Sequence, residues 1–147
     1  MKKVWVVVMA MVSICSAVSA QKSPVYAPKG VALDGYDAVA FFTQGKPVKG
    51  SSNYALQWNG AQWLFADKAD LESFKKEPEK YAPQYGGYCA YGASQGHKAS
   101  VEINTWSVVN NKLYLNYDQK VKSTWVKDEA SYIESADKKW PQIMNKD

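Results

Sequence analysis

The stretch WNGAQWLF, residues 58–65, decides the fold. Apolar residues alternate with polar ones before it, at Tyr54, Leu56 and Trp58, and this alternation is typical of a half-buried strand. Asn59-Gly60 is a pair strongly preferred in two-residue hairpin turns, because both positions need a positive φ. The stretch therefore predicts a β-hairpin whose second strand runs to Phe65.

A short helix is predicted directly after this hairpin. Asp67 is a residue type that favours the N-cap position, and the apolar residues Leu71 and Phe74 follow at helical spacing. Pro78 ends this helix or starts another helical turn. Together these segments form one hairpin–helix unit.

A second unit with the same plan is predicted near the C-terminus. Residues 105–109 read as a strand, Asn110-Asn111 as a turn and residues 112–117 as the returning strand. Asp118 then favours a helix cap. The apolar residues that follow fit one helical face with a break near Asp128.

The two units can be aligned by one constant shift along the chain. The shift brings Asn59 onto Asn110, Asp67 onto Asp118 and Phe74 onto Trp125. An internal repeat explains this alignment, and so does the common plan of any two hairpin–helix units. Both explanations predict the same fold class, a single α+β domain with two β-hairpin–helix units packed around one aromatic core.

The remaining segments complete the predicted organisation. Residues 21–30 are polar with two prolines and are expected to form a flexible N-terminal segment, and residues 31–141 form the domain. Within it, residues 39–43 are apolar and β-prone and read as a strand, followed by a turn at 44–47. Residues 142–147 are expected to form a C-terminal tail.

The first twenty residues predict a secretory signal peptide. Lys2 and Lys3 precede an apolar run over residues 4–14, and small residues lead up to Ala20. The apolar run is shorter than the roughly 20 residues that a membrane span needs. We therefore expect cleavage after Ala20 and a periplasmic or secreted protein without a membrane span.

Composition excludes several functional classes. The formal net charge of +4 falls to +2 once Lys2 and Lys3 are removed, and the chain has no arginine. A clustered basic face of the kind that binds nucleic acid is therefore not expected. No phosphate-binding loop, zinc-protease motif or hydrolase elbow occurs, and one histidine limits acid–base chemistry. The sequence predicts a protein that is not an enzyme.

The hairpin stretch, with Phe74 and Pro78-Glu79-Lys80-Tyr81 after it, resembles the core of the YHS domain. Residues 33–37 and residues 81–92, which read YAPQYGGYCAYG, resemble the exported, stand-alone branch of that family. The resemblance covers nearly all of the chain after the leader. It implies a YHS-type domain over residues 31–141.

The family resemblance also implies a soft-metal site made of cysteines. In this chain the three cysteine positions correspond to Ala40, Ala66 and Asp70. Alanine has no donor atom, and a carboxylate prefers harder cations than copper or zinc. The usual metal site of the family therefore cannot form here.

Cys89 and His97 are the candidate metal ligands that remain. Cys15 lies in the leader, so Cys89 has no cysteine partner in the exported chain. A site for copper or another soft transition metal would use Cys89 with His97. Two alternatives stay open: a buried structural cysteine, or a reactive thiol at a helix that begins after Gly86-Gly87, with His97 as base.

Aromatic residues offer a different kind of site. Tyr81, Tyr85, Tyr88 and Tyr91 are spaced as one side of a helix would require. They pack between the hairpins, or Tyr85, Tyr88 and Tyr91 form the wall of a groove for a small ligand. The expected partner is thus a metal ion or a small ligand, and the sequence identifies no protein partner.

A polar cluster at Asp34, Tyr36 and Asp37 has two readings. It caps a turn, or it holds a hard cation.

Overall fold

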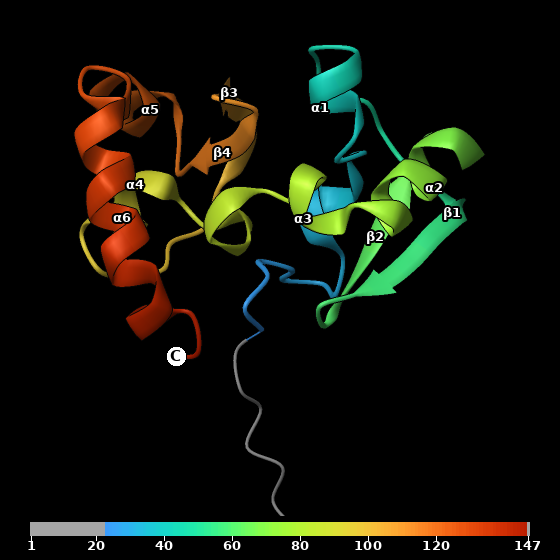
Figure 1. Cartoon of the computed structure of the whole chain (residues 1–147), viewed down its shortest axis with the longest axis horizontal. Helices are drawn as coiled ribbons and strands as arrows, with labels where there is room; N and C mark the ends of the chain where they lie inside the picture. Colours follow the sequence, from blue (N-terminus) through green and yellow to red (C-terminus); the bar gives the residue numbers. More distant parts are fainter. Residues whose placement is uncertain (1–22, 147) are drawn as a thin grey trace, which may run out of the picture.

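The computed structural model describes residues 23–146, so the predicted signal peptide lies outside the described residues (Figure 1). The chain forms two lobes, each built on one hairpin. The elements in chain order are η1 (Ala32–Gly35), α1 (Ala40–Thr43), β1 (Ser51–Trp58), β2 (Ala61–Phe65), α2 (Lys68–Lys76), α3 (Pro78–Tyr81), η2 (Gln84–Gly87), α4 (Ala90–Ser94), β3 (Glu102–Val109), β4 (Lys112–Asn116), α5 (Gln119–Trp125) and α6 (Glu129–Ile143).

The first hairpin confirms the prediction from residues 58–65. β1 and β2 pair antiparallel, with Trp58 opposite Ala61 on either side of the turn. Asn59 and Gly60 adopt φ values of 50° and 78°, as a turn of this hand requires. Alternate residues of β2, namely Ala61, Trp63 and Phe65, are buried.

The second hairpin has the same form. β3 and β4 pair antiparallel, with Val109 opposite Lys112. Asn110 and Asn111 adopt φ values of 51° and 60°, which asparagine tolerates better than most residues. Each hairpin is a separate two-stranded sheet, and the two hairpins lie in different lobes (Figure 1).

The helices that follow the hairpins begin at the predicted caps. The Asp67 carboxylate accepts the backbone N–H of Asp70 at 2.8 Å, and the Asp118 carboxylate accepts that of Val121 at 2.8 Å. Each bond satisfies a backbone donor of the first helical turn that has no partner within the helix. The break expected near Asp128 is present between α5 and α6.

The predicted α+β fold class is confirmed, and its aromatic core is divided into two clusters. In the first lobe Phe74 is fully buried, and its ring centroid lies 4.9 Å from that of Trp63 and 5.1 Å from that of Phe65. In the second lobe Trp125 is fully buried against Tyr114 at 5.4 Å. Phe74 and Trp125 thus occupy the same place in their units, as the aligned sequences predict.

A tight left-handed turn precedes each hairpin. In η1, Leu33 and Asp34 have φ values of 52° and 51°, and in η2, Tyr85 and Gly86 have φ values of 56° and 62°. η1 packs against β2 of the first lobe, and η2 packs against β4 of the second.

Residues 39–43 were predicted as a strand, and this prediction is wrong. They form the short helix α1. The buried Asp37 carboxylate accepts the backbone N–H groups of Val39 at 2.9 Å and Ala40 at 3.3 Å. These bonds satisfy the first donors of a helix, and they outweigh the β propensity of the side chains.

The chain ends differ from the expected boundaries. The described part of the N-terminal segment, residues 23–30, was expected to be flexible but packs between the lobes, with Val25 only 3% exposed. At the other end α6 continues to Ile143, which is buried, so the helix extends into the expected tail. Within residues 23–146, no helix combines the length and apolar character that crossing a membrane requires.

Candidate functional site

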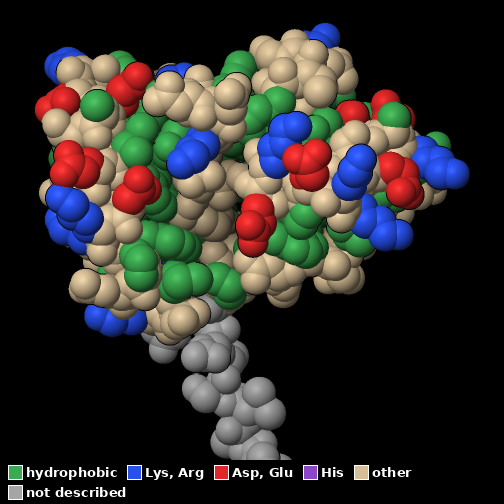
Figure 2. Space-filling view, viewed as in Figure 1, with side chains coloured by type: hydrophobic (Ala, Val, Ile, Leu, Met, Phe, Trp, Pro, Cys, Tyr) green, Lys and Arg blue, Asp and Glu red, His purple; other side chains and the backbone are tan. Residues whose placement is uncertain are grey.

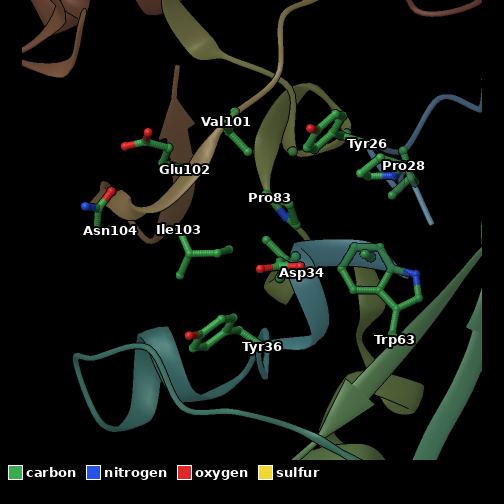
Figure 3. A pocket seen from close by; sticks show the side chains of 15 residues that line it. Tyr26, Pro28, Asp34, Tyr36, Trp63, Pro83, Val101, Glu102, Ile103 and Asn104 are labelled. Atoms are coloured by element: carbon green, nitrogen blue, oxygen red, sulfur yellow. The ribbon is translucent and has the colours of Figure 1, made fainter. Parts of the chain in front are cut away.

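A cleft of about 570 Å³ lies at the junction of the two lobes. We call it the junction cleft. Its walls come from three places: the turn η1 with Trp63 from the first lobe, the turn η2 with the start of β3 from the second, and the N-terminal segment. Figure 3 shows these side chains around the opening.

The N-terminal segment is fastened across the junction by hydrogen bonds. The backbone N–H of Tyr26 donates to the Gly86 carbonyl at 2.8 Å, and the Tyr88 hydroxyl donates to the Ser23 carbonyl at 3.1 Å. The rings of Tyr26 and Tyr88 also pack against each other in a tilted arrangement, with centroids 5.3 Å apart. These contacts fix Val25 and Tyr26 as one wall of the junction cleft.

Backbone strain is concentrated at another wall of the cleft. Leu33 and Asp34 both line the cleft, and both have positive φ values. The left-handed conformation is unfavourable for a residue with a Cβ atom by roughly 1–2 kcal/mol. Strained residues of this kind cluster at functional sites, where the surrounding structure holds them in place.

Cys89 lies away from the cleft, at the start of α4. Its side chain is 1% exposed. The sulfur accepts the backbone N–H of Gly92 at 3.4 Å and donates to Asn116 Oδ1 at 3.6 Å. Burial raises the pKa of the thiol, and backbone N–H groups offset this only in part. The environment favours a protonated, structural cysteine that caps α4.

His97, the other predicted metal ligand, is exposed. Its Nε2 lies close to Gly92, 3.4 Å from the position that a Cβ atom would take there. Cys89 and His97 therefore approach the same glycine, but the sulfur is enclosed and the imidazole faces solvent. Residues 23–146 contain no group of three His, Cys, Asp or Glu side chains placed to hold a metal ion. Copper binding by this pair stays a prediction.

The tyrosines do not lie on one helix, so that part of the prediction is wrong. The segment is divided among α3, η2 and α4 because the left-handed turn at Tyr85–Gly86 interrupts it. Tyr85 is buried and donates to the Asp137 carboxylate at 2.9 Å. Tyr88 faces the N-terminal segment, and Tyr91 packs on Tyr132 with centroids 5.2 Å apart. Ligand binding by Tyr85, Tyr88 and Tyr91 stays a prediction, without a shared surface to support it.

The three positions that the YHS resemblance assigns to cysteine converge in space around Asp37. One Asp37 oxygen accepts the N–H of Ala40 at 3.3 Å, and the other accepts that of Ala66 at 2.9 Å. The third position, Asp70, lies beside the same carboxylate, and the pKa of Asp70 is raised by burial and by its interaction with Asp37. Asp37 therefore accepts the hydrogen bonds that hold the turn and the start of α1, in agreement with the turn-capping alternative.

Asp70 gives the protein a specific pH dependence. Its pKa is raised from 3.8 to about 7, first by burial, then by a hydrogen bond with Asp37 and by the charges of Asp37 and Asp67. One Asp70 oxygen is buried without a donor. The folded state therefore binds an extra proton between about pH 4 and 7, and this contribution to stability is lost as the pH rises through that window.

We expect Asp70→Asn to stabilise the protein at pH 8 by about 1–2 kcal/mol, a value reduced from the full pKa shift because the side chain is partly solvated. The asparagine side chain can still donate a hydrogen bond to the Asp37 carboxylate, and it has no ionisable group. Urea unfolding at pH 8 and at pH 4 measures the effect, which should nearly vanish at pH 4. Glu72→Gln, on the exposed face of α2, is the control. An equal effect at both pH values would contradict the raised pKa of Asp70.

Sequence reasoning missed the junction cleft as a site. Its lining residues come from segments that are distant along the chain, such as Tyr26, Leu33 and Ile103. The Leu-Asp-Gly run at 33–35 was the available local signal, because its glycine marks a tight turn. The chain matches no protein-family model, no curated protein and no solved structure, and its membership of the YHS family stays a prediction.

Proposed function

We propose that this chain is an exported, non-catalytic binding module that holds a small organic molecule in the junction cleft. The observation that carries the proposal is the cleft itself, a hollow of about 570 Å³ walled by both lobes and by the N-terminal segment. Small-molecule sites in proteins have volumes of roughly 300–1,000 Å³ and lie preferentially where two units meet.

The lining of the cleft supports this proposal. Tyr26 and Tyr36 are half-buried and supply aromatic surface, and Val101 and Ile103 supply aliphatic surface. Mixed aromatic and apolar walls with a few polar groups are typical of ligand pockets. The strained backbone at Leu33 and Asp34 adds an independent reason, because the fold maintains an unfavourable conformation there.

The other candidate sites have less structural support. Metal binding by Cys89 requires the sulfur to leave its bonds with Gly92 and Asn116, and thiol chemistry requires a thiolate that burial disfavours. The mature protein therefore uses Cys89 in packing, and the cleft is the part of the surface shaped for a ligand.

A cleft-filling variant tests the proposal. We expect matched small probes (2-phenylethylamine, 2-phenylethanol and 3-phenylpropionate) to shift the backbone amide NMR signals of Leu33, Gly87 and Ile103 saturably. A ligand of about ten non-hydrogen atoms should bind with a Kd of roughly 1–10 mM. Ile103→Trp fills the cleft and should abolish these shifts.

Val108→Trp is the matched control for Ile103→Trp. Val108 lies on the same strand, is 36% exposed and does not line the cleft, so its replacement should leave binding unchanged. The proposal is overturned if none of the three probes shifts the cleft signals, or if Ile103→Trp leaves the shifts intact.

A further inference from the structure

The charged side chains that line the junction cleft are both acidic. Asp34 projects from the first lobe, and Glu102 projects from the start of β3 in the second. Among the described residues, no lysine or histidine is part of the lining. The cleft is therefore a region of negative charge on a chain whose net charge is positive.

The Asp34 carboxylate occupies a central place in the cleft. Figure 3 shows it in the middle of the lining side chains, with Ile103 on one side and Trp63 on the other. Glu102 and Asn104 lie at the edge opposite Trp63. Within residues 23–146, neither Asp34 nor Glu102 forms an ion pair. Both carboxylates are thus available to a ligand that enters the cleft.

Lys49 lies beside Asp34 but binds its backbone carbonyl and not its carboxylate. The Lys49 ammonium donates to the Asp34 backbone carbonyl at 3.0 Å and lies 4.5 Å from the centroid of the Tyr36 ring. This contact shows that the Tyr36 ring accepts a cation over one of its faces. Tyr26, which is half-buried, contributes further ring surface to the cleft.

We propose that the ligand of the junction cleft is an organic cation, a protonated amine or quaternary ammonium attached to an apolar body. The inference rests on the proposed binding function and specifies its ligand class. The carboxylates of Asp34 and Glu102 neutralise the cationic group, and the apolar body packs against Tyr36 and Ile103, which line the cleft and are half-buried. Aromatic walls beside negative charge recognise such a cation by its charge and its apolar surface together.

A bare metal ion fits the same carboxylates poorly. Calcium takes six to eight oxygen ligands, whereas the cleft offers two carboxylates on different lobes among apolar walls. No group of three metal-ligating side chains occurs in the described part of the chain. The apolar surface of the cleft would remain unused by an ion of this kind.

Three matched probes distinguish the ligand class by charge. 2-Phenylethylamine, 2-phenylethanol and 3-phenylpropionate have a similar ring and chain, and carry positive, no and negative charge at pH 7. We expect the amine to bind about tenfold more tightly than the alcohol, as a cation–π contact and two partly exposed carboxylates would give together. The acid should bind more weakly than the alcohol. Raising the salt concentration should reduce the preference.

Two isosteric variants assign the preference to its residues. Asp34→Asn removes the charge and keeps the left-handed backbone, which asparagine tolerates well, and Glu102→Gln does the same on β3. Each should weaken binding of the amine by about two- to fivefold and leave the alcohol unchanged. Glu72→Gln, outside the cleft, should change neither.

The outcomes separate the two proposals. Equal binding of the amine and the alcohol in the cleft, or stronger binding of the acid, overturns the cation proposal and leaves the binding function standing. The cation proposal also fails, with the binding function intact, if Asp34→Asn and Glu102→Gln both leave amine binding unchanged. Absence of all three probes from the cleft overturns the binding function itself. Saturable shifts with CaCl₂ in place of the amine identify the site as a metal site and overturn the organic-cation proposal.

Discussion

Replacing Gly86 by alanine is expected to lower the free energy of unfolding by more than about 3 kcal/mol. A Cβ atom at this position would overlap the Pro24 carbonyl oxygen and lie 2.8 Å from the Pro24 carbonyl carbon. These are backbone atoms of the N-terminal segment, so no side-chain movement relieves the overlap. The segment must shift away from the junction, and the bond between Tyr26 and Gly86 is lost with it.

Gly45→Ala is a matched control for this change. Gly45 has the same φ value of 62°, but a Cβ atom there meets nothing within 4 Å. Its replacement by alanine should therefore lower the free energy of unfolding only by the cost of the left-handed backbone, about 1–2 kcal/mol. Urea unfolding of both variants measures the difference. Equal destabilisation would mean that the contact with Pro24 contributes nothing to stability.

The second large effect is expected at Asp37. Asp37→Ala should lower the free energy of unfolding by about 3–5 kcal/mol, because three backbone N–H groups lose their acceptor in a buried place. These are the donors of Val39, Ala40 and Ala66. The same change removes the partner of Asp70. Thermal and urea unfolding at pH 5.5 test the prediction.

Asp128→Ala provides the control for Asp37→Ala. Asp128 also precedes a helix, α6, but its side chain makes no capping bond and is exposed. Its replacement should change stability by no more than about 0.5 kcal/mol. A comparable loss of unfolding free energy in both variants would mean that an aspartate before either helix stabilises the fold equally. That result would contradict the stabilising role assigned to the hydrogen bonds of Asp37.

The parts of the fold that were predictable depend on short-range signals. Asn59-Gly60 and Asn110-Asn111 determine their turns because few residues accept a positive φ, and Asp67 and Asp118 determine helix starts through their own side chains. The error at residues 39–43 has the same origin. There the local pattern is apolar and suits a strand, but the Asp37 carboxylate accepts the first backbone donors of a helix. Its other oxygen accepts the backbone N–H of Ala66, 29 positions further along the chain.

The candidate site could not be predicted in the same way. The junction cleft combines residues that the sequence separates widely, from Tyr26 to Asn104, and only the docking of the two lobes brings them together. The tyrosine spacing suggested a continuous helical face, which the left-handed backbone at Tyr85 divides. In Figure 2 the visible face shows interspersed acidic and basic side chains, with hydrophobic side chains gathered over the lobe that holds α4 and α6. Such a surface gives no compositional signal of a cleft.

The fastening of the N-terminal segment has a consequence for the order in which the protein folds. The Ser23 carbonyl accepts a hydrogen bond from the Tyr88 hydroxyl, which lies 65 positions later in the chain. Contacts of such long sequence separation form late, because a large loop must close before they contribute. As the chain leaves the ribosome N-terminus first, the Ser23 carbonyl has no access to this donor until Tyr88 has followed. The first hairpin–helix unit can assemble before that point, whereas the cleft becomes complete in the final stage of folding.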